Sequence, residues 1–220
     1  MKKQGATPTY VKISRGFFMN CTRLILIRHG ETDYNAEKKY YGFSDPLLNN
    51  TGIWQANRLY ERLKTEKIDK VYSSGLKRAR YTAEIVFKNS EIKIFSDLRE
   101  MNFGIFEGLH HSEIMEKYSQ IYTSWIENPL NIKIPKGEAF KSFKKRVLLI
   151  LKSIIAENTG LTVAIITHGG PIKIFLNEIF KEEPEKFWTI KQDSAALNII
   201  DYVGGTRPEI VTSNDISHLM

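Results

Sequence analysis

Two histidines in similar surroundings are the residues of this sequence best suited to chemistry. His29 lies between Arg28 and Gly30, and His168 comes directly before Gly169. Each histidine follows a short run of mainly branched apolar residues. A neutral imidazole can act as a nucleophile, and it exchanges protons near neutral pH. Both histidines are therefore candidates for catalysis.

Arginines and a glutamate occur at equivalent places, after other predicted strands. Arg78 follows a predicted strand over residues 70–73, and Glu100 follows one over residues 91–95. Arginine binds phosphate through a planar pair of donors, and a glutamate can give or take a proton. Because ligands of open α/β sheets bind outside the carboxyl ends of the strands, we expect these groups to meet at one edge. The pattern indicates phosphoryl transfer through a phosphohistidine.

The elements that must position these residues follow from the hydrophobic pattern. Apolar runs without alternation predict strands buried on both faces, and apolar residues at helical spacing predict helices. We expect strands over residues 23–27, 70–73, 91–95, 162–166, 196–203 and 209–212, and helices over residues 51–66, 76–89, 112–128, 138–158 and 172–180. This alternation predicts an α/β fold, a three-layer αβα sandwich whose central sheet is mostly parallel and carries helices on both faces.

Three shorter signals mark the ends of these elements. Thr51 is the predicted N-cap of the first helix, because its hydroxyl can accept from the first free backbone N–H groups. Gly160 is expected to end the helix over residues 138–158. Gly204-Gly205 predicts a turn between the last two strands.

Composition and charge favour a single globular domain. The chain has 220 residues, of which 42% are hydrophobic and 26% charged, which excludes disordered, collagen-like and disulfide-scaffold classes. The formal charge is +7, but residues 1–23 hold five basic side chains and no acid. A nucleic-acid binder is expected to carry basic residues over its folded surface, so we predict no nucleic-acid partner. We expect residues 1–20 to form a basic, mobile extension and residues 21–220 to form one domain.

Further features bear on location and on cofactors. No apolar run reaches the roughly 18 residues of a membrane span, and Cys21 is the single cysteine, which is typical of a reducing compartment. We therefore predict a cytoplasmic protein with no membrane partner. His110-His111 lacks a companion cluster of Cys or Asp, so we expect a place at the surface or at the rim of the substrate site. No Gly-x-Gly-x-x-Gly pattern indicates a dinucleotide.

Five segments taken together resemble the histidine phosphatase superfamily, which includes the phosphoglycerate mutases. They occur in the family's order across roughly residues 23–203. The segments are Leu26-Ile-Arg-His-Gly-Glu-Thr-Asp-Tyr-Asn35, residues 45–52, residues 72–79 with Thr82, residues 98–104 with Glu107-Gly108, and Ile166-Thr-His-Gly-Gly170. The resemblance implies a phosphoglycerate mutase-like version of the predicted sandwich.

The resemblance also implies a role for each matched residue. His29 corresponds to the phosphorylated nucleophile, Glu100 to the general acid and base, and His168 to the second histidine, which stabilises charge on the phosphoryl group. The residues implied in phosphate or substrate binding are Arg28, Asn35, Arg78, the Gly169 backbone N–H, Tyr41 and Gly42. No metal and no cofactor are implied.

Three functions stay open at this point. The first is a phosphomonoesterase acting on a small phosphorylated metabolite; α-ribazole 5′-phosphate of cobalamin biosynthesis is a candidate, because residues 99–109 and 167–173 are similar to the small bacterial branch. The second is a cofactor-dependent phosphoglycerate mutase, and the third is a non-catalytic phosphate-binding module. The modest length of residues 109–135 leaves the phosphohistidine open to water, which favours the phosphatase. The expected ligand is a small phosphate ester, and a homodimer stays open.

Overall fold

The computed structural model describes residues 10–12, 18–203 and 208–220, and its centre is a sheet. The strands run in the order β4-β3-β5-β2-β6-β7, with β1 paired to the start of β2. Their bounds are β1 Tyr10–Lys12, β2 Phe18–Arg28, β3 Lys70–Ser74, β4 Ile92–Phe95, β5 Thr162–Thr167, β6 Leu197–Val203 and β7 Pro208–Asp215. Strands β4, β3, β5 and β2 are parallel, whereas β6 pairs antiparallel with both of its neighbours. The prediction of a mostly parallel sheet is confirmed.

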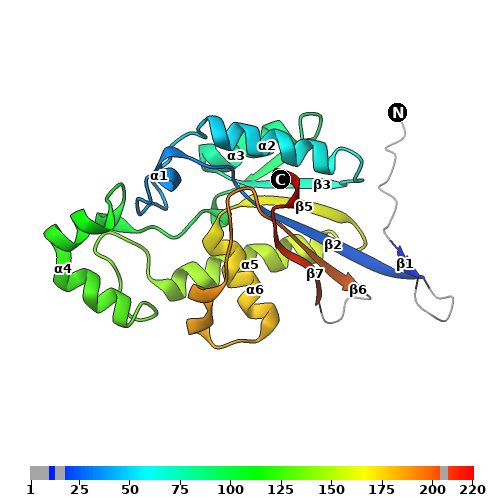
Figure 1. Cartoon of the computed structure of the whole chain (residues 1–220). Helices are drawn as coiled ribbons and strands as arrows, with labels where there is room; N and C mark the ends of the chain where they lie inside the picture. Colours follow the sequence, from blue (N-terminus) through cyan, green and yellow to red (C-terminus); the bar gives the residue numbers. More distant parts are fainter. Residues whose placement is uncertain (1–9, 13–17, 204–207) are drawn as a thin grey trace.

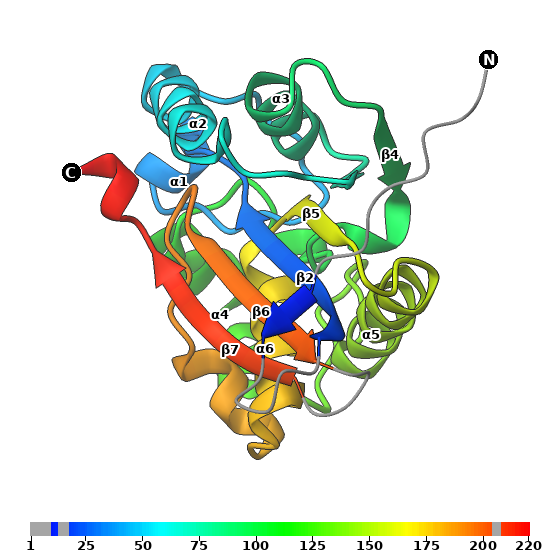
Figure 2. The same cartoon turned by 90° about the vertical axis from the view of Figure 1, so that its right-hand side faces the viewer.

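Helices cover both faces of this sheet (Figures 1 and 2). On one face lie α2 (Asn50–Leu63) and α3 (Lys77–Val86), and on the other lie α5 (Phe140–Glu157) and α6 (Gly169–Phe180). The predicted three-layer sandwich is therefore confirmed. The short helix α1 (Asp33–Ala36) and the helix α4 (His111–Glu127) lie beyond the carboxyl ends of the parallel strands, at the left of Figure 1. None of the described helices is long and apolar enough to cross a membrane.

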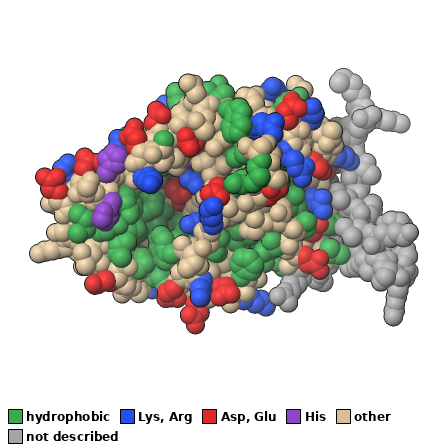
Figure 3. All heavy atoms as spheres, viewed as in Figure 1, with side chains coloured by type: hydrophobic (Ala, Val, Ile, Leu, Met, Phe, Trp, Pro, Cys, Tyr) green, Lys and Arg blue, Asp and Glu red, His purple; other side chains and the backbone are tan. Residues whose placement is uncertain are grey.

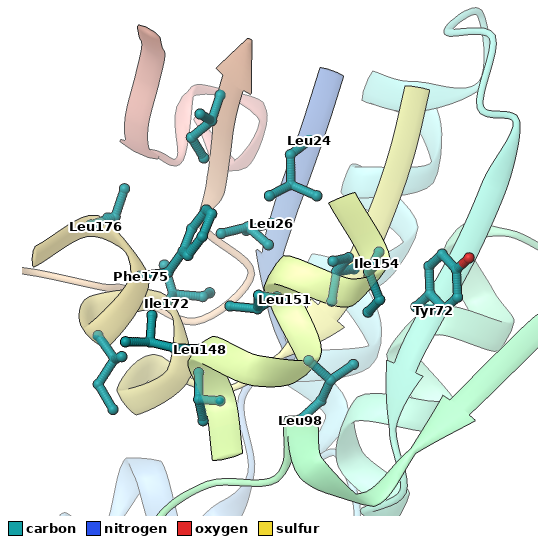
Figure 4. Packing of buried hydrophobic residues seen from close by; sticks show 14 of the residues in the cluster. Leu24, Leu26, Tyr72, Leu98, Leu148, Leu151, Ile154, Ile172, Phe175 and Leu176 are labelled. Carbon is teal, nitrogen blue, oxygen red and sulfur yellow. The ribbon is translucent and has the colours of Figure 1, made fainter. Parts of the chain in front are cut away.

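The two faces of β2 bury different side chains. Leu24 and Leu26 join the cluster formed with α5 and α6, whereas Ile25 and Ile27 join the cluster formed with α2 and α3. Successive side chains of a strand point to opposite faces, so a strand covered on both sides needs apolar residues at every position. Figure 4 shows the first cluster, in which Leu24 and Leu26 face side chains from the helices, among them Leu151.

A third cluster lies under α4, at the edge where the parallel strands end. Its buried members are Phe106, Ile114, Tyr122, Trp125 and Ile134. Helix α4 is kinked at Tyr118, whose φ of −141° is not helical. This small core packs α4 against its flanking loops.

The structure corrects several predicted ends. The N-cap of α2 is Asn49 and not Thr51, because the Asn49 side chain accepts from the Gly52 N–H at 2.8 Å. Helix α6 begins at Gly169, three residues before its predicted start, since Pro171 is tolerated in a first turn. Helix α5 ends at Glu157, and Gly160 follows with a φ of +79°. The predicted Gly204-Gly205 turn and most of the predicted extension over residues 1–20 lie outside the described residues.

Candidate active site

The carboxyl ends of two neighbouring strands place His29 and His168 side by side. Strands β2 and β5 are parallel partners, and Arg28 is paired with Thr167 at their ends. The next residue on each strand is the histidine, and the two ring centroids are 5.1 Å apart. Both side chains are buried, with 2% of His29 and 0% of His168 exposed. The structure thus joins the two histidines that the sequence singled out.

The hydrogen bonds of His29 fix which ring nitrogen carries the proton. Nδ1 lies 2.7 Å from the Gly30 carbonyl oxygen, which can only accept, so Nδ1 is the donor. Nε2 keeps its lone pair and accepts from Arg78 Nε at 3.2 Å. Burial, followed by the charges of Arg78 and Arg28, holds the pKa of His29 well below its ordinary value. The ring is therefore neutral at neutral pH, which is the form that can attack phosphorus.

His168 is held from behind by a serine of the next strand. Its Nε2 lies 2.8 Å from Ser74 Oγ at the end of β3, and Nδ1 has no hydrogen-bond partner among the described residues. Burial, and then the charge of Arg78, also hold the pKa of His168 well below its ordinary value. Since a buried polar nitrogen without a partner is costly, the ring is ready to bind a ligand through Nδ1.

Arg78 is a fully buried cation that faces His29. Besides its bond to His29, the guanidinium donates to the carbonyl oxygens of Ser44 at 2.8 Å and Gly42 at 2.7 Å. The Tyr41 ring lies against it, with 4.6 Å between the guanidinium carbon and the ring centroid. The side chain is 0% exposed, and its place is fixed from three sides.

The loop that holds Arg78 is itself held by Glu107. This carboxylate accepts from the backbone N–H groups of Phe43, at 2.8 Å, and of Ser44. Gly42 is buried in the same loop, where an added Cβ would lie 1.6 Å from the Met101 carbonyl oxygen. The structure thus places Gly42 behind Arg78, which it positions through its carbonyl group.

Arg28, Asn35 and Tyr41 line one hollow, of about 360 Å³, beside α1. The Asn35 side-chain oxygen accepts from the Tyr41 hydroxyl at 2.7 Å and from the Thr32 N–H at 3.1 Å. This leaves the Asn35 amide N–H groups to donate to an anion. Arg28 donates from Nη1 to the Gln192 carbonyl oxygen at 2.6 Å, and its Nε has no partner among the described residues.

A second hollow, of about 190 Å³, contains Glu100 and shares Arg28 with the first. Figure 3 shows this face of the molecule hollowed, with hydrophobic, basic and acidic side chains gathered around the depression. The Glu100 carboxylate accepts from the backbone N–H groups of Met101 and Gly170, each at 2.9 Å. Gly169 lines the same hollow, and an added Cβ there would lie 3.6 Å from Arg28 Nε. Glu100, the predicted general acid, thus lines the same hollow as Arg28, which is predicted to bind the phosphoryl oxygens.

Sequence reasoning missed two kinds of residue in this site. Lys173 lines the second hollow one helical turn after Gly169, and helical spacing along α6 could have found it. Gln192 acts through its backbone carbonyl, which side-chain patterns do not show. Phe103, Phe143, Phe187 and Trp188 supply the apolar wall.

The structure also locates the paired histidines that the sequence set aside. His110 is the N-cap residue of α4, and His111 is exposed, with its ring 5.1 Å from that of Tyr122. Within residues 10–12, 18–203 and 208–220, no group of three or more His, Cys, Asp or Glu side chains has an arrangement that could hold a metal ion.

Comparison with known proteins shows the family to which this chain belongs. A profile described as the histidine phosphatase superfamily (branch 1) matches residues 24–216. The chain belongs to this superfamily. Phosphoserine phosphatase 1 of Hydrogenobacter thermophilus is 30% identical over 199 residues, which are 90% of this chain and 94% of that protein. The adenosylcobalamin/alpha-ribazole phosphatase of Salmonella typhimurium is 29% identical over 185 residues, 83% of this chain and 92% of that protein.

A solved structure shows the fold independently. The crystal structure of a phosphoglycerate mutase from Bacillus anthracis superposes with a TM-score of 0.78, covering 91% of this chain and 96% of that chain. Because the two chains are only 23% identical, this similarity is evidence for the fold alone, and it confirms the predicted phosphoglycerate mutase-like architecture. Both relatives named above are phosphatases, which supports phosphatase activity in this superfamily member.

Proposed function

We propose that this protein is a metal-independent phosphomonoesterase that hydrolyses a small phosphorylated metabolite through a phosphohistidine on His29. The observation that carries the proposal is the state of that ring. Its Nδ1–H donates to the Gly30 carbonyl oxygen, and its Nε2 lone pair faces the buried Arg78 side chain. Permanently charged Arg28 and Arg78 supply the positive charge that a transferring phosphoryl group requires.

In the first step, Nε2 of His29 attacks phosphorus and the phosphoryl group replaces Arg78 Nε as the partner of Nε2. The new P–N bond forms as the bond between phosphorus and the leaving oxygen breaks. Arg28 and Arg78 stabilise the charge on the phosphoryl oxygens, together with the His168 ring. Glu100 enters this step protonated and gives its proton to the leaving oxygen.

In the second step, water attacks the phosphohistidine. Glu100 takes a proton from the water while the P–N bond breaks, which releases inorganic phosphate and returns His29 to its neutral form. A mutase would instead return the phosphoryl group to a bound alcohol, and it would need bisphosphoglycerate for activity. A non-catalytic module would bind phosphate with no turnover.

The names of the relatives supply the first substrates to assay. α-Ribazole 5′-phosphate and phosphoserine are the substrates indicated by the two phosphatases compared above. The proposed partner is such a small ester, with no nucleic-acid or membrane partner, and the proposed location is the cytoplasm.

The proposal is tested with p-nitrophenyl phosphate and the His29→Ala variant. We expect this variant to lose nearly all hydrolysis, whereas His111→Ala, which removes an exposed histidine outside both hollows, should keep it. Wild-type protein quenched during turnover should carry an acid-labile, base-stable phosphoryl label. Equal activity of the two variants, or activity lost in EDTA and restored by a divalent cation, would refute the proposal.

A further inference from the structure

The hollow beside Glu100 contains a lysine that the chemistry above does not use. Lys173 projects from α6 into the hollow that Glu100 and Arg28 also line. It is half-buried, and its Nζ lies 5.9 Å from the centroid of the Phe187 ring. Among the described residues, its ammonium group forms neither a hydrogen bond nor an ion pair within 4.0 Å. Its charge therefore has no close counterpart.

Two other half-buried cations are each paired with a carboxylate. Arg23 forms an ion pair with Asp201 at 2.7 Å, and Arg146 forms one with Glu138, also at 2.7 Å. Burial lowers the pKa of Lys173, and the more distant Glu100 carboxylate acts in the opposite direction. Partly burying a cation without a close anion costs free energy. Such a cost is typical of a site that a ligand completes.

The charges around the hollow indicate the sign of that ligand group. Arg28 and Arg78 face the phosphoryl group, and their charges offset its own. The Glu100 carboxylate accepts from two backbone N–H groups, and in the proposed first step it must carry a proton. At that stage Lys173 is the uncompensated charge on the side of the leaving group. An anionic group on the leaving alcohol would offset it.

We infer that Lys173 binds a carboxylate on the leaving alcohol, so that the preferred substrates are phosphate esters of small hydroxy acids. This inference rests on the proposed phosphatase function and names its substrate class. The hollow, at about 190 Å³, is below the roughly 300 Å³ at which pockets for drug-sized ligands begin, so it suits a chain of a few carbons. Of the described residues, Lys173 and Arg28 are the two cations that line it, and the rest of the wall is largely aromatic.

A matched pair of ligands tests this inference. The two ligands differ at the end remote from the phosphate, where 3-phosphoglycerate has a carboxylate and sn-glycerol 3-phosphate has a hydroxymethyl group. Their dissociation constants are measured by calorimetry on His29→Ala, which keeps the pocket but cannot form the phosphohistidine. We expect 3-phosphoglycerate to bind about tenfold or more tightly, as a charge-assisted hydrogen bond predicts.

Variants at Lys173 assign this preference to one side chain. In the His29→Ala background, Lys173→Met should weaken 3-phosphoglycerate binding about tenfold or more and change sn-glycerol 3-phosphate binding less than about threefold. Lys173→Arg keeps the charge and should retain most of the preference. Lys186→Met removes an exposed lysine close in sequence that does not line the hollow, and it should change neither constant.

The outcomes separate this inference from the proposed function. Equal weakening of both ligands by Lys173→Met, or no weakening of 3-phosphoglycerate, would overturn the role of Lys173. Hydrolysis by the wild type without a preference for the carboxylated ligand would refute the inference and leave the phosphatase standing. If binding of 3-phosphoglycerate is preferred and depends on Lys173, but the wild type hydrolyses no ester, the proposed phosphatase activity is refuted and the role of Lys173 stands. Should Lys173→Met not fold, loss of the preference in the folded Lys173→Gln variant decides the same question.

Discussion

Replacing Gly170 with alanine should displace the Glu100 carboxylate. A Cβ at position 170 would lie 2.0 Å from Glu100 Oε1 and 2.9 Å from Phe143 Cζ, whereas distances under 3.0 Å are essentially never seen for a real Cβ. Phe143 is fully buried in the core, so the more exposed carboxylate is the group that yields. Its movement also breaks the 2.9 Å hydrogen bond from the Gly170 N–H.

The size of the effect depends on how much the leaving group needs a proton. A positioned general acid contributes about 10²- to 10⁴-fold, so kcat/KM for sn-glycerol 3-phosphate should fall about 10²-fold or more in Gly170→Ala. p-Nitrophenolate leaves with little protonation, and the loss with p-nitrophenyl phosphate should be about tenfold or less. Phosphate release from both esters is measured under the same conditions.

The neighbouring glycine supplies the control. A Cβ at Gly169 would lie 3.6 Å from Arg28 Nε, which is an ordinary contact. Gly169 starts α6, where alanine is also the better helix former. Gly169→Ala should therefore hydrolyse both esters at close to the wild-type rate. If Gly170→Ala keeps the same activity on sn-glycerol 3-phosphate as Gly169→Ala, Glu100 is not the general acid.

The remaining predictions concern the buried polar groups. Because the folded-state pKa values of His29 and His168 lie well below the ordinary value, the unfolded chain binds protons that the folded protein does not, and stability should fall as the pH drops below about 6.5. Each ring should contribute up to about 2 kcal/mol to the loss of unfolding free energy between pH 7 and pH 5. Urea unfolding of His29→Asn should therefore show a smaller loss over this range than the wild type does. A wild-type unfolding free energy that stays level from pH 7 to pH 5 would contradict the two pKa shifts. Ser74→Ala removes the hydroxyl 2.8 Å from His168 Nε2 and should lower kcat/KM for p-nitrophenyl phosphate about 5- to 100-fold, as loss of a buried hydrogen bond predicts; an unchanged value would show that the serine does not hold the ring. Arg78→Lys keeps the charge but cannot reproduce the three donors of the guanidinium, so kcat/KM should fall by about 10²-fold or more; a lysine variant with wild-type kinetics would show that charge alone suffices.

Much of the fold was predictable because it depends on residue types along each segment. The unbroken apolar runs of β2 and β5 predict strands covered on both faces, and the structure has α2 and α3 on one face and α5 and α6 on the other. Element ends were less predictable. A single hydrogen bond, which the Asn49 side chain accepts from the Gly52 N–H, decides where α2 starts, and Thr51 carries an equally suitable oxygen.

How the positions behind the reactive groups act could not be predicted, because they act through backbone atoms or through a second residue. Gly42 holds Arg78 with its carbonyl oxygen, and Glu107 holds the loop containing Gly42. Helical spacing relates Lys173 to Gly169, but only the packing of α6 places it in the same hollow as Glu100.

The sequence by itself determined which reactive groups this protein has and that they lie at the carboxyl ends of strands, since side-chain chemistry and the place of a residue directly after a strand are local properties of the chain. The tertiary structure alone decided the state of those groups. The tautomer of His29 follows from one carbonyl at 2.7 Å, and its neutrality follows from burial beside two arginines, one of which comes from helix α3. Protonation and hydrogen bonding respond to atoms within a few ångströms, whatever their distance along the chain, and only the folded packing brings those atoms together.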